Sequence, residues 1–397
     1  MTFTAHASIH DVLPTSRVRR AAGCLFSPAS LGQSPGSALG PAHPRPHPLP
    51  RPQHTSAMAY RTSTVSPLFP SRQVKSGLHF VAKCYVPEDR SPAGVTLLFF
   101  HCAGSHKEAW EPTLDAMVSV LESRAEGSPI REVWAFDMQS HGEAACLNHK
   151  ALEESGAKLS VEDYAEGFQA FCASGTLVNH RLIAIGHSLG ATAMLLALME
   201  KNPPVTFESM ILVEPALITK VVYDEHLEER EGALKTMSIA IMKRRDTWNT
   251  REEAKEYFQK RFPWMIWDPR IIDRYVRHGL REIQVEEGGV KVTKVTLCCT
   301  KLQERMAYTY ESGSDAPHFR VVAWLQSLSP PPKMHFISGE RADLVPEYIH
   351  KSMIDLGIFS SVQKVPAAGH FVVQEQPDGL GKAIAQALMK CTSRARL

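Results

Sequence analysis

The chain has 397 residues, with 44 lysines and arginines against 42 acidic residues, so its formal net charge is only +2. This balance provides no basic excess of the kind that binds nucleic acid or an anionic membrane, and no nucleic-acid partner is expected. The content of 44% hydrophobic and 22% charged residues excludes a wholly disordered chain, a collagen-like fibre and a protein with several membrane spans. No uninterrupted run of 18 apolar residues predicts a transmembrane segment.

The first 57 residues differ from the rest of the chain, because they hold nine of its 27 prolines, five arginines and a single acidic residue. Proline lacks the amide hydrogen and fixes φ, so the stretch 41–52 (PAHPRPHPLPRP) forms neither a helix nor a central strand. We therefore expect a disordered Pro/Arg-rich leader over residues 1–65. An organellar targeting segment, or translation that starts at Met58, are the alternatives for this region.

From residue 76 onward, short apolar runs alternate with helical patterns. The continuous run 95–100 (VTLLFF) is typical of a strand that is buried on both faces. Such alternation predicts βαβ units, hence an α/β fold with a mostly parallel central sheet flanked by helices. The expected strands are 78–86, 95–100, 132–137, 181–186, 209–214, 334–338 and 362–365, and the expected helices are 107–124, 161–175, 189–201 and 379–391.

One interval of roughly 120 residues, between the strands at 209–214 and 334–338, is too long for a bare loop in a compact domain. It is charged and rich in helix-forming residues, so we predict a mainly helical cap insertion. The predicted division is a core of 66–216 and 331–392, a cap of 217–330 and a tail of 393–397. The aromatic residues of the insertion either line a substrate pocket or, as we favour, build a small core: Trp248, Phe258, Phe262, Trp264 and Trp267.

The strongest chemical signal is Gly186-His187-Ser188-Leu189-Gly190, which lies between an apolar strand pattern and an Ala- and Leu-rich helix pattern. In this setting G-x-S-x-G predicts a nucleophile elbow, a tight turn that lifts the Ser188 hydroxyl off the sheet. The backbone amide of Leu189 is the expected first donor of an oxyanion hole. The second donor is expected from Ala103, in the loop after 95–100, with Cys102 as the reserve.

A serine nucleophile needs a base and an acid that orients the base. His370 follows the last predicted strand, at the edge where parallel sheets place their active residues, and is the expected base. For the acid we favour Asp343, because the Leu-Val-Pro after it resembles the usual acid loop. Glu340 and Glu214 remain the alternatives. The order Ser188, Asp343, His370 is the order expected of one hydrolase fold.

The eight cysteines show neither C-x-x-C nor Cys/His zinc spacing, and no glycine-rich phosphate loop is visible. The sequence therefore predicts no metal and no organic cofactor. Small, buried and reduced thiols are expected in place of a disulfide framework.

These motifs resemble the α/β-hydrolase superfamily over about residues 76–392. Within them, the stretch HKEAWEP (106–112), together with HGLRE (278–282), is similar to a fungal branch of peroxisomal lipase-like hydrolases and enzymes of host-selective toxin biosynthesis. The resemblance implies a structural role for Asp137 and His141. The landmarks that carry it are HCAGSHKEAWEP (101–112), FDMQSHGEAA (136–145), IGHSLGATA (185–193), LVEPA (212–216), SGERADLVP (338–346) and AGHFVVQEQP (368–377).

We therefore expect a serine hydrolase that cleaves a small-molecule ester, lipid-like or with a small apolar acyl group, through an acyl-enzyme intermediate. A thioesterase or a carbon–carbon bond hydrolase with the same triad, and a non-catalytic binding scaffold of this fold, are the alternatives. The C-terminal Ala395-Arg396-Leu397 resembles the Ser-Lys-Leu peroxisomal address. It predicts recognition by a peroxisomal import receptor and a peroxisomal location, with the cytoplasm as the alternative.

Overall fold

The computed structural model describes residues 60–88, 90–123, 129–199, 205–309 and 315–392. Most of the expected leader and all of the expected tail 393–397 lie outside these ranges. The predicted leader boundary at residue 65 is wrong, because β1 (Tyr60–Val65) pairs antiparallel with β4 (Val81–Pro87). The Tyr60 ring packs edge-on against Tyr85 with the ring centres 6.0 Å apart, which anchors this edge strand to its neighbour.

The central sheet of the described residues has eight strands in the order β1-β4-β6-β5-β7-β8-β12-β13. Neighbouring strands from β6 to β13 run parallel, whereas β4 pairs antiparallel with both of its neighbours, β1 and β6. The predicted mostly parallel sheet is therefore confirmed. Its other strands are β5 (Val95–Phe100), β6 (Ile130–Asp137), β7 (Arg181–His187), β8 (Phe207–Val213), β12 (Met334–Gly339) and β13 (Phe359–Val365), and a separate pair is formed by β2 (Leu68–Phe69) and β3 (Leu78–His79).

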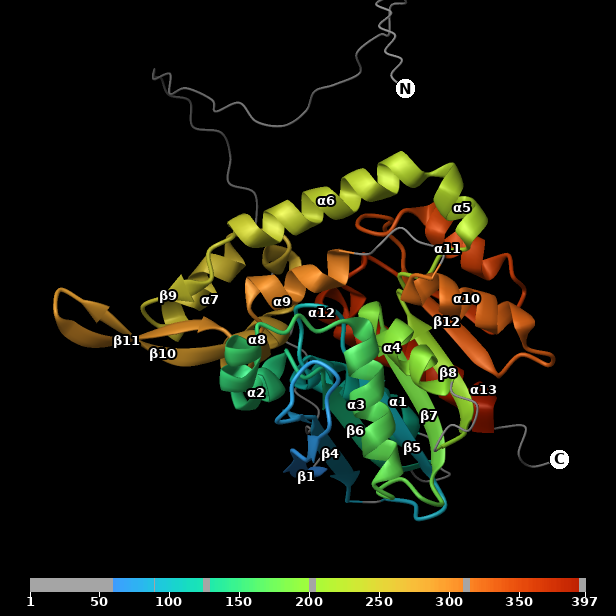
Figure 1. Cartoon of the computed structure of the whole chain (residues 1–397). Helices are drawn as coiled ribbons and strands as arrows, with labels where there is room; N and C mark the ends of the chain where they lie inside the picture. The colour runs from blue at the N-terminus through green and yellow to red at the C-terminus, as the bar shows by residue number, and fades with distance from the viewer. Residues whose placement is uncertain (1–59, 89, 124–128, 200–204, 310–314, 393–397) are drawn as a thin grey trace, which may run out of the picture. The chain divides into compact units, whose positions relative to one another are not determined.

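Helices cover both faces of this sheet (Figure 1). On one face α3 (Val161–Ala173) packs against α4 (Leu189–Leu198), and on the other α1 (Glu111–Glu122) packs against α13 (Pro377–Thr392). Burial on two faces explains why β5, which is buried at every position, is apolar at every position except Thr96. The remaining helices of the core are α2 (Gly142–Ser155), α11 (Glu347–Ile354), α12 (Val372–Glu375) and a 3-10 turn at Lys107–Trp110.

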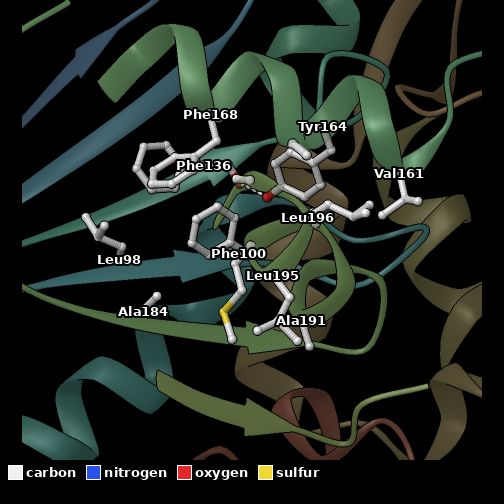
Figure 2. Packing of buried hydrophobic residues seen from close by; sticks show 14 of the residues in the cluster. Leu98, Phe100, Phe136, Val161, Tyr164, Phe168, Ala184, Ala191, Leu195 and Leu196 are labelled. Atoms are coloured by element: carbon white, nitrogen blue, oxygen red, sulfur yellow. Dashed lines mark hydrogen bonds between the residues drawn. The ribbon is translucent and has the colours of Figure 1, made fainter. Parts of the chain in front are cut away.

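The core beneath α3 and α4 is rich in aromatic rings (Figure 2). Phe100 of β5 meets Phe168 of α3 edge to face, with the ring centres 4.8 Å apart. The Tyr164 hydroxyl donates to the backbone carbonyl of Phe136 at 3.0 Å, so its one polar atom is satisfied inside the core. This packing fixes α3 and α4 on the sheet, and with them the turn at which α4 begins.

The interval between β8 and β12 contains helices, as predicted, and also a three-stranded antiparallel sheet that was not predicted from the sequence. In this sheet β11 (Val290–Leu297) pairs with β10 (Leu280–Glu287) and with β9 (Thr247–Trp248). Gly288 and Gly289, with φ of 59° and 81°, form the turn of the β10–β11 hairpin. The helices are α5 (Lys220–Glu225), α6 (Leu227–Lys243), α7 (Arg251–Gln259), α8 (Pro269–His278), α9 (Lys301–Arg305) and α10 (Pro317–Ser327), with 3-10 turns at Trp264–Ile266 and Met306–Tyr308.

The last of these helices, α10, packs against α4 of the core. It therefore belongs to the packing of the core, although the predicted cap extends to residue 330 and includes it. Elsewhere in the cap, the buried Trp248, Phe258, Trp264 and Trp267 form one hydrophobic cluster with residues of α8. Phe262 is the exception, because 57% of its surface is exposed. The favoured interpretation of the aromatic residues as a cap core therefore holds for four of the five.

Candidate active site

Ser188 lies at the junction of β7 and α4, and its φ of 52° is a value that L-residues rarely adopt. This sharp turn requires the glycines around it. A Cβ at Gly186 would lie 2.6 Å from the Ala191 Cα, and a Cβ at Gly190 would lie 2.4 Å from the Phe100 carbonyl oxygen. The Ser188 amide donates to the Val213 carbonyl at 3.0 Å. The turn has the strained strand-to-helix geometry that the sequence predicts.

The His370 ring contacts the Ser188 hydroxyl, with 3.1 Å between Nε2 and Oγ. Hydrogen bonds fix both the backbone carbonyl and the backbone amide of His370. His187 Nε2 donates to the His370 carbonyl at 2.8 Å, and the His370 amide donates to Asp343 Oδ1 at 2.9 Å. Burial lowers the pKa of His187 to about 3, so this ring is neutral and serves as a fixed donor.

Glu214, one of the two alternative acids, is the carboxylate that contacts the His370 ring. Its Oε2 lies 3.1 Å from His370 Nδ1, and its Oε1 accepts from the Gly339 amide at 2.5 Å. Burial alone would raise the pKa of Glu214, but hydrogen bonding from His350 and His370 outweighs it and lowers the pKa to about 2. Because an ionised carboxylate only accepts hydrogen bonds, His370 Nδ1 carries the proton and Nε2 is free to accept from Ser188.

The favoured acid, Asp343, is wrong as the partner of the ring. Its carboxylate binds backbone, since Oδ1 accepts from the amides of His370 (2.9 Å) and Leu344 (2.6 Å). Its other oxygen lies 3.1 Å from the Arg341 guanidinium. Glu340 is also turned away from the ring and accepts from the Ala367 amide at 3.1 Å. Asp343 therefore positions the loop that carries His370.

The topology explains this correction. Glu214 follows β8 directly, and β8 lies between β7 and β12 in the sheet. Its amide donates to the Ile337 carbonyl of β12 at 2.8 Å, and its φ of 46° turns the backbone at the end of the strand. A carboxylate placed directly after a buried strand was the available sequence signal. His187 and His350 were not predicted as parts of this network.

Both residues expected to supply the oxyanion hole line the cavity that contains Ser188. Leu189 is the first residue of α4, so its amide has no partner within the helix. Ala103 lines the same cavity as Ser188, Leu189 and His370, whereas Cys102 does not. Burial raises the pKa of the Cys102 thiol to about 12, which makes it an unreactive side chain.

The loop that carries Ala103 is fixed by two buried histidines. His101 Nε2 accepts from the Met138 amide at 3.1 Å, and His141 Nε2 accepts from the Gly104 amide at 3.0 Å. Next to them, the fully buried Lys107 forms an ion pair with Asp137 at 2.8 Å. These contacts are structural, in keeping with the role that the resemblance implies for Asp137 and His141.

A cavity of about 510 Å³ opens onto Ser188 and His370. Its volume falls in the range of roughly 300–1,000 Å³ that is usual for small-molecule sites. The cap forms much of its wall, because α6 contributes Met237 and Ala240 and the loop after β8 contributes Ile218. The wall is therefore mainly apolar, with the hydroxyl and imidazole of the candidate catalytic pair at one side.

Within the described ranges, no three or more His, Cys, Asp or Glu side chains are grouped so as to hold a metal ion. Of the helices in this part of the chain, none has the length and apolar character needed to cross a bilayer.

Comparisons with known proteins agree with the geometry. The fold is similar to that of the peroxisomal alpha-beta-hydrolase Lpx1 from Saccharomyces cerevisiae, with 19% identity, a TM-score of 0.65 and coverage of 86% of this chain and 92% of that one. It is also similar to an esterase of M. tuberculosis (17% identity, TM-score 0.52, coverage 82% and 92%). A third similar structure is the thioesterase domain from the curacin biosynthetic pathway (15%, 0.51, 81% and 99%).

No curated protein matches the chain. A family model does match it, over residues 97–383, and this span contains the serine turn, Glu214 and His370. The fold, the strained turn and this match together show that the chain belongs to the alpha/beta hydrolase family.

Proposed function

We propose that this hydrolase cleaves carboxylic esters through a Ser188–His370–Glu214 triad. The observation that carries the proposal is the continuous chain of contacts from the Ser188 hydroxyl through both ring nitrogens of His370 to the ionised Glu214, each 3.1 Å long. This order of groups matches the nucleophile, base and orienting acid of acyl-transfer enzymes.

The proposed reaction has two halves. Ser188 Oγ attacks the ester carbonyl while His370 Nε2 takes the hydroxyl proton, and His370 then gives that proton to the leaving alcohol. Water next attacks the acyl-enzyme with His370 as the base and releases the acid. The amides of Leu189 and Ala103 stabilise the oxyanion in both halves, and Glu214 stabilises the imidazolium.

The mainly apolar cavity supports a substrate with an apolar acyl group or a small lipid-like body. The test is a panel of p-nitrophenyl esters of increasing acyl length, run beside matched acyl thioesters and carbon–carbon bond substrates. We expect ester turnover by the wild-type protein and a loss of at least about 10³-fold in Ser188→Ala. Turnover of only thioesters or carbon–carbon substrates would replace the ester assignment, and no turnover at all by folded protein would favour the scaffold alternative.

We also propose that the protein acts in peroxisomes, in lipid or secondary-metabolite (toxin) metabolism. The support is the Ala395-Arg396-Leu397 terminus, which lies outside the described residues, and the fold shared with a hydrolase described as peroxisomal. A fluorescent protein fused before residue 1 should co-localise with a peroxisomal marker and become diffuse when the last three residues are deleted. A fusion that is diffuse with the terminus intact would assign the protein to the cytoplasm.

A further inference from the structure

A second cavity, of about 340 Å³, lies beside the reaction cavity. The two cavities share a wall, which includes Ala103 and Met237. Because Ala103 is the expected oxyanion donor, a carbonyl group at Ser188 lies at the boundary between the two spaces. One substituent of a substrate can therefore enter each cavity.

The wall of the second cavity that is not shared is strongly aromatic. Trp264 and Trp267 belong to the packed cap core, and Phe371 follows His370 directly. The ring centres of Trp267 and Phe371 lie 5.8 Å apart, which ties the cap wall to the loop of the base. Flat rings that are already fixed by packing suit a flat aromatic ligand. The aromatic residues that line this cavity and not the reaction cavity are Tyr257, Phe262, Trp264, Trp267, Tyr275 and Phe371.

Two arginines line this cavity, and within the described part of the chain only one of them is paired with a carboxylate. The Arg244 guanidinium is paired through both terminal nitrogens with the Glu304 carboxylate, so these two charges cancel. Arg261 lies 4.3 Å from the centre of the Tyr257 ring. Among the residues that the structure describes, no carboxylate lies within 4.0 Å of the Arg261 guanidinium. The described lining therefore carries one uncompensated positive charge, at Arg261.

We propose that the second cavity binds an aromatic group of the substrate that carries a carboxylate, with Arg261 as the residue that selects the charge. The aromatic wall takes the ring, and the guanidinium on Tyr257 takes the acid. This proposal names a substrate class for the proposed esterase. Cleavage of such a substrate rests on the proposed esterase function, whereas its binding in the second cavity does not. Binding in the cavity is measured without turnover.

The experiment uses Ser188→Ala protein and two ligands of the same shape, 2-naphthoate and 2-naphthamide, in calorimetric titrations at low salt. We expect 2-naphthoate to bind about 5-fold more tightly, a modest preference because Arg261 is exposed. Adding Arg261→Gln should abolish the preference. Adding Arg230→Gln instead should leave it unchanged, because Arg230 lines only the reaction cavity.

Equal affinity for the two ligands in the parent protein would overturn the proposal. So would a preference that survives Arg261→Gln or disappears in Arg230→Gln, since the anion would then lie elsewhere. A protein that hydrolyses no ester but shows the Arg261-dependent preference would refute the esterase function and keep the binding site. The two failures are therefore distinguishable.

An independent observation concerns two thiols. Cys146 lies on α2 of the core, Cys298 follows β11 of the cap segment, and their Sγ atoms are 3.4 Å apart although 152 residues separate them. A disulfide has sulfurs about 2.05 Å apart, so only a small approach is needed. Cys146 is exposed and Cys298 is buried. Hydrogen bonding from Cys298 and the nearby Arg281 lower the pKa of Cys146, which favours its reactive thiolate.

We infer that Cys146 and Cys298 form a reversible disulfide when the protein meets hydrogen peroxide. The Cys146 thiolate attacks one peroxide oxygen and releases hydroxide, which leaves a sulfenic acid. The Cys298 thiol then attacks that sulfur, the S–S bond forms and water leaves. In sum, two thiols and one peroxide give one disulfide and two waters. The bond would tie α2 to the segment that leads into α9, whose Glu304 holds Arg244.

The test treats the full-length protein with equimolar hydrogen peroxide and maps its peptides without reduction. We expect one linked pair, Cys146–Cys298, and a rise in Tm of about 5 °C that dithiothreitol reverses. Cys146→Ser should show neither, whereas Cys299→Ser, which removes the neighbouring buried thiol, should show both. Thiols that stay free, or a Cys146 that is oxidised further without a cross-link, would overturn the inference.

Discussion

Replacing Glu214 with glutamine keeps the size of the side chain and removes the charge that faces His370. The carboxylate oxygen lies 3.1 Å from Nδ1. At an effective dielectric constant of 20, unit charges at that separation interact by about 5 kcal/mol. Since each 1.36 kcal/mol is a factor of ten in rate, we expect kcat/KM to fall by about 10³- to 10⁴-fold. The glutamine amide can also donate to Nδ1, which would favour the wrong tautomer.

The matched control is Asp343→Asn. Its side-chain oxygen still accepts from the backbone amides of His370 and Leu344, and only the charge opposite Arg341 is lost. We expect kcat/KM to change by less than about tenfold. Both variants are assayed on the best ester of the panel, with thermal melts to confirm folding. A 10³-fold loss in Asp343→Asn together with near-normal Glu214→Gln would refute the assignment of Glu214.

Three further predictions concern stability. Lys107→Met leaves the buried Asp137 carboxylate without its cation, so urea denaturation should show a loss of about 3–5 kcal/mol in the free energy of unfolding, and a loss below about 1 kcal/mol would contradict the buried pair. Gly190→Ala places a methyl carbon 2.4 Å from the Phe100 carbonyl oxygen, so it should cost at least about 1–3 kcal/mol in the same assay, and an unchanged stability would refute the close approach. The pKa of Glu214 is lowered from 4.5 to about 2, so ionised Glu214 contributes about 3 kcal/mol to the free energy of unfolding. This contribution is fully present above pH 4.5 and is lost as the pH falls toward 2. Melts across that range should therefore show a smaller acid-induced loss of stability in Glu214→Gln than in the wild type, and parallel curves would contradict the lowered pKa.

Much of the sheet could be predicted because it is buried on both faces. The run 95–100 coincides with β5, and the other expected strands of the sheet differ from the observed ones by a few residues at their ends. The β10–β11 hairpin was missed because its strands are largely exposed and carry many charged side chains, which resemble a charged helical segment in composition. Its signal was local: two alternating patterns on either side of Gly288-Gly289.

The serine and the histidine could be predicted because their local patterns carry their chemistry. Ser188 lies between Gly186 and Gly190, two positions at which the turn leaves no room for a side chain. His370 follows the end of a strand. The acid could not be chosen in this way. Glu214, Glu340 and Asp343 all follow strands that end at the same edge of the sheet, and only side-chain direction separates them. The strand that precedes Glu214, β8, lies next to β7, which precedes Ser188, and this is known only once the strand order is known.

The proposed triad requires that Ser188 is an activated nucleophile. The most direct measurement is the reaction of the full-length protein with a fluorophosphonate probe, followed by intact mass and peptide mapping. We expect one bound probe per chain, located on Ser188, and no labelling of a folded Ser188→Ala variant. Folded wild-type protein that stays unlabelled, or a probe found on another residue, would contradict the proposed triad.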